Sequence, residues 1–410
     1  MFLHKTSCSD RRFFYIPAQR FFFTKHRFYG RITDGELSKI HFYADIEHLS
    51  FSHEDQAISI SKITFTEEHT MKKIISMILV LAMVLALAGC AGTTVVVNNY
   101  NYYGTTTTEP VVAEGAIRTG LAIVTGLSTT DASAEAEGNA EFAITLAGIL
   151  VDENDVILDC SIDAIGHTFT FDATGAITSD LEAQVLTKNE LGDNYNMKTY
   201  SDAIAEWYEQ IDAFEAYCIG KTIYEIQDGA LTESGYAADV DLATSATINL
   251  FDCMSALVTA HSNAQALGAE AGDKLVLSCT TSLGESEQGN AQLNVDAVAL
   301  TTNGDGVITS CQIDSLQGKA TIDENGAVTA TNIDTKNTLG FDYNMVAWGG
   351  ATYEWFEQAA NFASYITGKT AAEVEGIAIN EETKPAEADL ATSVTISIIG
   401  FKTLIAKALG

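Results

Sequence analysis

Apolar and polar residues alternate along four short runs of the chain, and turn-forming residues separate these runs in pairs. The runs are residues 142–150, 156–165, 293–300 and 307–316. Alternation of this kind is typical of a β-strand with one buried face, and the Asp, Asn and Gly residues at 152–155 and 303–306 predict tight turns. The pattern therefore predicts two β-hairpins, each followed by another turn, at residues 172–175 and 323–326.

Downstream of each hairpin, the spacing of apolar residues changes to that of a helix. In the first such segment the apolar positions are Ile204, Trp207, Ile211, Phe214 and Cys218. They would share one helix face, which should be buried. Gly220 stands where a helix end favours positive φ, and Thr222 and Thr370 each begin a capping-box pattern that should start a short helix. A final apolar helix is predicted over residues 248–260 and again over 396–409.

The two helical segments are copies of each other. Residues 188–260 align without a gap on residues 336–408, with 29 identities in 73 positions at a constant offset of 148. This period is much longer than that of a solenoid repeat, so each copy should be a domain. We expect an α+β fold of two tandem repeat domains, residues 111–264 and 265–410, each an antiparallel β-sheet packed with helices.

A lipoprotein signal peptide precedes the repeats. Lys72 and Lys73 begin it, the apolar run over residues 74–87 is short for a bilayer span, and Leu-Ala-Gly-Cys ending at Cys90 matches the bacterial lipobox. We therefore expect residues 71–90 to be a signal peptide and Cys90 to carry diacylglycerol. The alternative is a transmembrane anchor with an incidental cysteine. Two acyl chains suffice for stable anchoring, so the protein is expected on the extracytoplasmic face of a bacterial membrane.

The residues on either side of the signal peptide are expected to lie outside the folded repeats. A signal peptide works at an N-terminus, so we interpret residues 1–70 as translation upstream of the true start, or as disordered; the alternative is a genuine extension. Residues 91–110 are rich in Thr, Asn and Tyr without a helical period, which is typical of a flexible tether.

The charge narrows the range of partners. The chain carries a formal net charge of −33, and after Cys90 it has 11 Lys and Arg against 46 Asp and Glu. Such an acidic surface repels phosphate backbones, so we expect no nucleic-acid partner. Only His167 and His261 follow Cys90, and the pattern contains neither metal-ligand spacing nor a Ser-His-Asp set. We therefore predict no metal site and no catalytic residues.

Five cysteines lie in the repeats. Cys160 aligns with Cys311 at an offset of 151, whereas Cys218, Cys253 and Cys279 align with large apolar residues. Cysteine that alternates with apolar residues is typical of a buried thiol. An odd number also argues against a complete disulfide framework. We predict free, buried thiols.

One stretch is repeated almost without change and is rich in hydroxyl groups. Asp-Leu-Ala-Thr-Ser-x-Thr occurs at residues 241–247 and 389–395, before the final helix of each copy. The free N–H groups and dipole of a helix N-terminus favour an anion, so the stretch predicts a phosphate pocket. The alternative is that Asp, Ser and Thr simply cap the helix. The candidate residues are Asp241, Thr244, Ser245 and Thr247 in the first copy, and Asp389, Thr392, Ser393 and Thr395 in the second.

The order of these motifs resembles the FMN-binding domain family, which occurs in membrane redox complexes and in surface lipoproteins. The resemblance rests on three motifs. The first is the hairpin turn at residues 305–308, which is matched less well at 154–157, and the second is the loop at 189–192 and 337–340. The third is the repeated stretch, which is similar to the family motif D-x-x-[ST]-G-A-T. The resemblance covers most of each copy, although its motifs are short.

In this family a flavin transferase links FMN through its phosphate to the last threonine of the motif. The resemblance therefore implies FMN on Thr247 and Thr395, with Asp241 and Asp389 orienting the loop or a metal of the transferase. The loop glycines that it implies at the cofactor are Gly192 and Gly340.

The sequence departs from the family pattern in three places. Ser245 and Ser393 replace the motif glycine, Val394 replaces the alanine, and the loop lacks its proline. Glycine allows a backbone to approach a cofactor closely, so serine here would narrow the pocket or remove recognition by the transferase. Two functions stay open. One is an electron carrier with covalent FMN and a redox partner, and the other is a flavin-free binding or structural lipoprotein.

Two further pairs of aligned residues could touch a flavin. Trp207 and Trp355 fall on a helix face where aromatic residues usually pack in the core, so we expect core packing instead of flavin stacking. Lys221 and Lys369 follow a helix-ending glycine, and we expect them to interact with the helix end instead of a phosphate.

Overall fold

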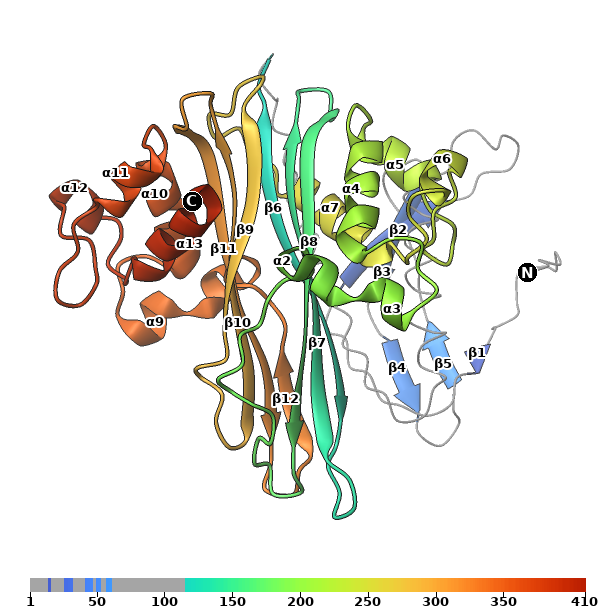
Figure 1. Cartoon of the computed structure of the whole chain (residues 1–410). Coiled ribbons are helices and arrows are strands. Elements are labelled where there is room, and N and C mark those ends of the chain that lie inside the picture. The colour runs from blue at the N-terminus through green and yellow to red at the C-terminus, as the bar shows by residue number, and fades with distance from the viewer. Residues whose placement is uncertain (1–13, 16–25, 32–40, 47–48, 53–56, 61–114) are drawn as a thin grey trace. The chain divides into compact units, whose positions relative to one another are not determined.

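The computed structural model describes residues 14–15, 26–31, 41–46, 49–52, 57–60 and 115–410 (Figure 1). The chain forms two compact units, Met1–Ala91 and Gly92–Gly410. The described elements of the first unit are paired antiparallel strands: β1 (Phe14–Tyr15) with β5 (Ala57–Ile60), β5 with β4 (Leu49–Ser52), and β2 (His26–Arg31) with β3 (His41–Ile46). The predictions of a signal peptide, of lipid on Cys90 and of a tether fall on residues outside those described.

A three-stranded antiparallel sheet forms in the first half of the second unit, residues 115–264. Its strands are β6 (Arg118–Thr130), β7 (Gly138–Val151) and β8 (Ile157–Phe171), in the order β6-β7-β8. Pairing of β7 with β8 confirms the first predicted hairpin. The sequence pattern does not predict β6, which pairs with β7 along its whole length.

A four-stranded antiparallel sheet forms in the second half, residues 265–410. Its strands are β9 (Lys274–Ser282), β10 (Asn290–Thr302), β11 (Ile308–Ile322) and β12 (Val328–Asn332), in the order β12-β11-β10-β9. Pairing of β10 with β11 confirms the second predicted hairpin. The turn at residues 323–326 leads into β12, whereas the aligned turn in the first half leads to an isolated bridge between Phe171 and Ile177.

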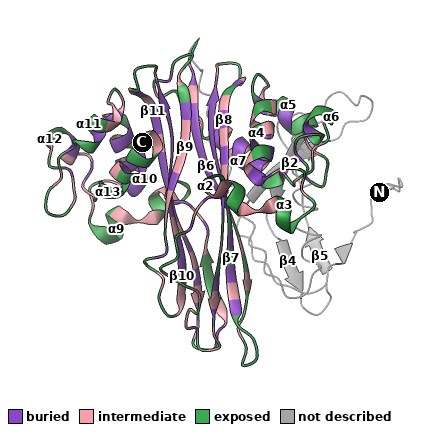
Figure 2. Ribbon diagram, viewed as in Figure 1, coloured by how far each residue is buried: buried purple, intermediate pink, exposed green. Residues whose placement is uncertain are grey.

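The two sheets share one hydrophobic core. Its central members are Phe142, Ile144 and Leu146 on β7 and Leu293, Val295 and Ala297 on β10. These positions alternate along their strands because successive side chains of a strand point to opposite faces. Figure 2 shows the buried residues concentrated in the strands. Burying one large side chain of this kind contributes about 1.5–3 kcal/mol, so this core joins the two halves into one packed body.

A chain of hydroxyl groups also crosses between the halves. Thr119 Oγ1 on β6 lies 2.6 Å from Ser310 Oγ on β11, which lies 2.7 Å from Thr301 Oγ1 on β10. Thr301 in turn lies 2.7 Å from Thr309 Oγ1, and Thr309 donates to Asp273 Oδ2 at 2.6 Å. Burying a polar group without a hydrogen-bond partner costs free energy. In this series of hydroxyl groups, from Thr119 to Thr309, each buried hydroxyl has a partner.

Helices cover the outer face of the first sheet (Figure 1). They are α2 (Lys188–Leu191), the 3₁₀ helix η1 (Gly192–Tyr195), α3 (Met197–Tyr200), α4 (Trp207–Cys218), α5 (Ile223–Gly229), α6 (Val240–Ala243) and α7 (Phe251–Ser262). The predicted apolar face of α4 is buried in this layer. Ile204 is the exception, because it precedes the helix and is 55% exposed. Gly220 has the predicted positive φ, and Thr222 the predicted capping box.

Helices also cover the outer face of the second sheet. They are α8 (Lys336–Leu339), η2 (Gly340–Tyr343), α9 (Met345–Gly349), α10 (Trp355–Ile366), α11 (Ala371–Glu375), α12 (Ala388–Ala391) and α13 (Ile399–Leu409). Phe362, Phe401 and Leu404 belong to the core that joins α10 and α13 to β10 and β11. The fold is therefore α+β, with two antiparallel sheets between outer layers of helices.

The five cysteines of residues 115–410 are free and buried, as predicted. Burial raises the pKa of both Cys253 and Cys279 to about 12. Thiols with such pKa values carry almost no thiolate at neutral pH, so they are poor nucleophiles. Among the helices that the structure describes, none has the length and apolar character needed to cross a membrane.

Candidate functional site

The repeated hydroxyl-rich stretch does not lie at the start of the final helix. In the first half α6 ends at Ala243 and α7 begins at Phe251, and in the second half α12 ends at Ala391 and α13 begins at Ile399. The predicted starts at residues 248 and 396 are wrong by three residues, and the hydroxyls lie in the connection before the helix. The stretch therefore does not form the N-terminus of the final helix, and phosphate binding by its hydroxyls stays a prediction.

Four of the predicted hydroxyls lie beside a short helix and three of them bind its backbone. Thr244 Oγ1 donates to the carbonyl of Asp241 at 2.7 Å, and Thr392 Oγ1 donates to the carbonyl of Asp389 at 3.0 Å. Ser393 Oγ lies 3.4 Å from the carbonyl of Leu390. Ser245 uses its backbone N–H in the same way, toward Leu242. These groups bond carbonyls at the C-terminal ends of α6 and α12. The capping alternative is wrong for the final helices, because α7 and α13 begin after Leu250 and Ile398, which make no side-chain cap bond.

Thr247 and Thr395 are held differently. The backbone N–H of Thr247 donates to Gln210 Oε1 at 2.8 Å, and its hydroxyl donates to the same oxygen at 3.2 Å. Thr395 makes the same two bonds to Gln358 Oε1, again at 2.8 and 3.2 Å. Thr247 is exposed and Thr395 is half-buried, whereas both glutamines are fully buried. The N–H and O–H donors of each threonine therefore point inward, to a buried glutamine, although Thr247 itself is exposed and Thr395 partly so.

The orientation of each glutamine amide is determined by its other contacts. Gln210 Nε2 donates to the carbonyl of Ala205 at 2.9 Å and lies 3.6 Å from Met197 Sδ. Gln358 Nε2 donates to the carbonyl of Tyr353 at 2.8 Å and lies 3.4 Å from Met345 Sδ. With the NH₂ group facing acceptors on one side, only the amide oxygen can face the threonine.

Glu206 and Glu354 anchor the segment that carries these methionines. Glu206 is buried, and its carboxylate accepts from the backbone N–H of Met197 at 2.7 Å and of Lys198 at 3.4 Å. Glu354 accepts from the N–H of Met345 at 2.7 Å. Both carboxylates also cap the helix that follows. A buried carboxylate with several backbone donors is well satisfied without a cation.

Gly192 and Gly340 lie in turns next to this segment. Each ends a short helix with positive φ, +49° and +51°, a conformation that favours glycine. A Cβ on either residue would meet nothing within 4 Å. The glycines thus allow the turns, and the chain beyond them reaches Gln210 and Gln358 through Met197 and Met345.

The serines that replace the motif glycine fit the backbone. In residues 115–410 the non-glycine residues with positive φ are Asp155, Asn196, Asn344 and Thr383. Ser245 and Ser393 are therefore outside the left-handed region, and serine costs no backbone strain at these positions.

The aligned tryptophans belong to the core, as predicted. Trp207 and Trp355 are only 4% and 5% exposed. Lys188 Nζ lies 5.1 Å from the ring centroid of Trp207, and Lys336 Nζ lies 4.9 Å from that of Trp355. Such cation–π contacts stabilise a partly buried ammonium group. Burial nevertheless holds the pKa of Lys336 below its ordinary value.

The aligned lysines after the helix-ending glycines are also placed as predicted. Lys221 Nζ donates to the carbonyl of Tyr217 in the last turn of α4 and lies 3.8 Å from the centroid of that tyrosine ring. Lys369 Nζ lies 4.4 Å from the ring centroid of Tyr365. These cations interact with the ends of α4 and α10.

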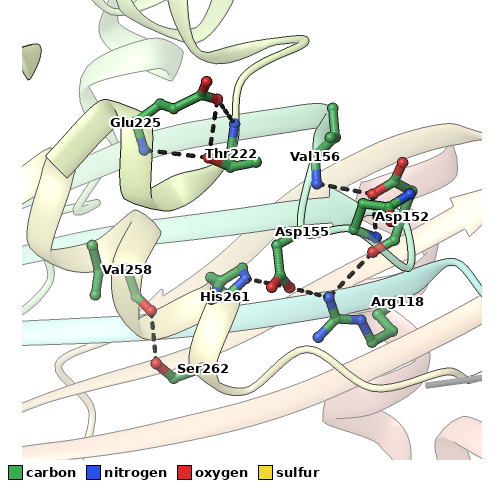
Figure 3. A network of polar contacts seen from close by, with 10 residues as sticks. Arg118, Asp152, Asp155, Val156, Thr222, Glu225, Val258, His261 and Ser262 are labelled. Carbon is green, nitrogen blue, oxygen red and sulfur yellow. Dashed lines mark hydrogen bonds and ion pairs between the residues drawn. The ribbon is translucent and has the colours of Figure 1, made fainter. Parts of the chain in front are cut away.

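A second polar cluster lies at the turn between β7 and β8 (Figure 3). Asp155 forms an ion pair with Arg118, and its Oδ1 lies 2.9 Å from His261 Nε2 on α7. Arg118 also donates to the carbonyl of Asp152 at 3.2 Å. Burial alone would raise the pKa of Asp155, but hydrogen bonds from Arg118 and His261 outweigh it and hold this pKa below its ordinary value. The cluster ties the start of β6, the hairpin turn and the end of α7 together.

The cavity described for residues 115–410 lies elsewhere than at the threonines. The described cavity has a volume of about 330 Å³ and lies between residues 183–186 and β9, beside Glu190 and Lys407. Within the described part of the chain, no group of three or more His, Cys, Asp or Glu side chains could hold a metal ion.

Gln210 and Gln358 are the residues that sequence reasoning missed. Both occur in the repeated Glu-Trp-x-Glu-Gln motif, at a position that falls on the buried face of the helix. A polar residue that recurs at a core position was the signal that could have identified them.

Comparison with known proteins adds no relative: no protein-family model, no curated protein and no solved structure matches this chain.

Proposed function

We propose that this protein is a lipid-anchored electron carrier on the extracytoplasmic face of a bacterial membrane, with FMN esterified to Thr247 and Thr395. The observation that carries the proposal is the pair of threonines itself. In both halves a threonine has its N–H and O–H fixed on the carbonyl of a buried glutamine, and it is exposed in the first half and half-buried in the second. A side chain that must be reached by a modifying enzyme has to be accessible and held in a defined position.

A phosphoester on either threonine would keep the backbone bond to glutamine and lose the hydroxyl bond. After esterification the hydroxyl hydrogen is gone, and the ester oxygen would face the glutamine oxygen, which also only accepts. Rotation about the threonine Cα–Cβ bond relieves this contact because Thr247 is exposed and Thr395 partly so. The 2.8 Å bond from the backbone N–H to the glutamine stays in place and keeps the residue fixed.

The chain supplies the scaffold and FMN supplies the redox chemistry when it is attached. Gln210 and Gln358 position the acceptor residues, and the turns at Gly192 and Gly340 lead the chain past them. Asp241 and Asp389, exposed on α6 and α12, are available to a metal of the transferase. In this proposal the protein is a carrier that serves a redox partner.

The anchor in this proposal is the lipid on Cys90. Two acyl chains on one cysteine hold a protein on a bilayer without a membrane-spanning helix. After Cys90 the chain has 46 acidic and 11 basic residues, and this negative charge repels anionic headgroups, so the folded unit would stand away from the surface on its tether.

A second candidate is a flavin-free binding or structural lipoprotein. The observation that favours it is the placement of the other hydroxyls, which bind their own backbone at α6 and α12 instead of converging on one point. The described cavity also lies away from both threonines. In this alternative the Gln–Thr contacts only connect the loop to α4 and α10.

Protein purified from its native host distinguishes the two candidates. The electron carrier should absorb in the flavin bands, and the intact mass should exceed that of the lipidated polypeptide by two FMN groups less two water molecules. Changing Thr247→Ala should remove one FMN, and adding Thr395→Ala should remove both, with the far-UV spectrum unchanged. Wild-type protein without flavin absorbance or added mass would favour the second candidate.

A further inference from the structure

We propose that Gln210 and Gln358 are positioning residues for flavin attachment: each holds the acceptor threonine so that its hydroxyl hydrogen points inward and its oxygen lone pairs face the transferase. This inference rests on the proposed function. It assigns a role to two buried side chains that neither the sequence pattern nor the resemblance identifies.

The proposal rests on one geometric feature: a single glutamine oxygen accepts two hydrogen bonds from the same threonine. Gln210 Oε1 accepts the N–H of Thr247 at 2.8 Å and its O–H at 3.2 Å, which fixes both the backbone and the side-chain rotamer. The amide cannot turn round, because its Nε2 is committed to the carbonyl of Ala205 at 2.9 Å. Gln358 reproduces this arrangement around Thr395 with distances that agree within 0.1 Å for the bonds to the threonine and to the carbonyl of Tyr353.

The hydroxyl is the part of this arrangement that needs a functional reason. Any residue at position 247 could give its backbone N–H to Gln210, so the connection of the loop to α4 does not require threonine. Residues 241–245 and Ile248 are also identical in the two halves, whereas Ala246 is aligned to Val394 and Asn249 to Ser397. The threonine and glutamine are identical, as an acceptor and its positioning group should be.

The attachment step is a phosphoryl-type transfer from an FMN phosphoanhydride. The threonine Oγ1 forms the new bond to phosphorus, the anhydride P–O bond breaks, and the other half of the anhydride leaves with the bonding electron pair. As the Oγ1–P bond forms, the hydroxyl proton leaves its bond to the glutamine carbonyl, which is far too weak a base to keep it, and passes to a base of the transferase. Gln210 and Gln358 therefore act before the step, by directing the lone pairs outward.

The two halves provide a control within one molecule. In Gln210→Leu, produced in the native host, FMN attachment at Thr247 should fall by about tenfold, the effect of losing one orienting hydrogen bond. Attachment at Thr395 should stay at the wild-type level, and Gln358→Leu should give the mirror result. Both sites are measured separately, by peptide mass spectrometry after brief growth, so that slow attachment is not hidden by saturation.

A conservative variant separates positioning from general damage. In Gln210→Glu the buried carboxyl should take up a proton, because burial disfavours the charged form. Its O–H can then donate to Ala205 and its other oxygen can accept from Thr247, so attachment at Thr247 should recover. Glu215→Gln is the matched control on the same helix α4: Glu215 Oε1 bonds the N–H of Ile162 on β8 and has no bond to Thr247, so this variant should leave both sites labelled.

The outcomes are distinguishable. Wild-type protein without FMN at either threonine would remove the proposed function and this inference with it. If wild-type protein carries FMN at both threonines and the Gln210→Leu variant carries equal amounts at both, this inference is overturned while the proposed function stands. If Gln210→Leu does not fold, folded Gln210→Glu decides: label at Thr247 supports positioning by the acceptor oxygen, and loss of label at Thr247 alone contradicts it.

Discussion

The turn between the long strands is built in two ways in this molecule. In the first half it places Asp155 at φ +63°, and in the second half the aligned position is Gly306 at φ +74°. Glycine reaches this region without cost, whereas an aspartate there needs support from its surroundings. Arg118 and His261 provide it, while the residues aligned with them are Lys274 and Leu409.

The buried faces of α4 and α10 differ in a similar way. Glu215 of α4 lies against β8, where its Oε1 accepts the N–H of Ile162 at 2.5 Å, and the aligned residue of α10 is Ala363. Burial raises the pKa of Glu215 from about 4.5 to about 8, and the neighbouring carboxylates Asp212 and Asp159 add to this. The first half therefore carries titratable groups where the second half carries Gly and Ala. These groups should make the stability of the first half more dependent on pH than that of the second. The Gln–Thr contact at the proposed attachment site, by contrast, is the same in both halves.

Replacing Glu215 should have the largest effect on this difference. Folded Glu215 keeps its proton up to about pH 8 and the unfolded chain releases it near pH 4.5, so wild-type stability should fall as the pH rises between these values. Glu215→Gln keeps the bond to Ile162 without titrating. The variant should be more stable than wild type by up to roughly 4 kcal/mol above pH 8, and nearly equal to it at pH 4.5. Urea unfolding from pH 4.5 to 8.5 measures this, and parallel curves over the whole range would contradict it.

Replacing Gly306 should have a smaller effect. A Cβ at Gly306 would meet nothing within 4 Å, so Gly306→Ala tests the backbone conformation alone. It should lower the free energy of unfolding by about 1–2 kcal/mol. The matched variant Asp155→Gly loses two polar contacts and gains a relaxed backbone, so its net effect at pH 7 should stay within about 0.5 kcal/mol. Equal losses in both variants would show that the two turns are supported alike.

Replacing Arg118 should have a smaller effect at neutral pH than replacing Gly306. Because the pKa of Asp155 is lowered, its contribution is present above the ordinary Asp pKa and is lost as the pH falls through the folded value. Arg118→Met should cost about 0.5–1 kcal/mol at pH 7 and should flatten the acid side of the stability curve. Thermal unfolding between pH 2.5 and 7 measures both, and an unchanged acid limb would contradict the role of Arg118.

The regular elements of the fold were predictable because their periodicity is strong. Both hairpins, the buried face of α4 and the buried thiols follow from alternation or helical spacing. The starts of α7 and α13 were not predictable from periodicity. Before α7, for example, Ala246 and Leu250 are buried in the connecting loop and continue the helical spacing although the loop is not a helix. Periodicity reports which residues face the core, and a packed loop can satisfy it as well as a helix can.

The candidate site was predictable only in part. Thr247 and Thr395 stand out as repeated hydroxyls, but nothing local separates them from Thr244 and Thr392, which bind their own backbone. The difference arises from a glutamine 37 residues upstream in each half. A binary pattern counts Gln210 as a surface residue, so the contact becomes visible only when α4 packs against the loop.

The most direct test of the central claim is the mass of two peptides from the native mature protein, one containing Thr247 and one containing Thr395. The account predicts that each peptide carries one FMN less one water, with fragment ions placing it on the threonine. Unmodified peptides at both positions, in protein from a host that makes the flavin transferase, would contradict it.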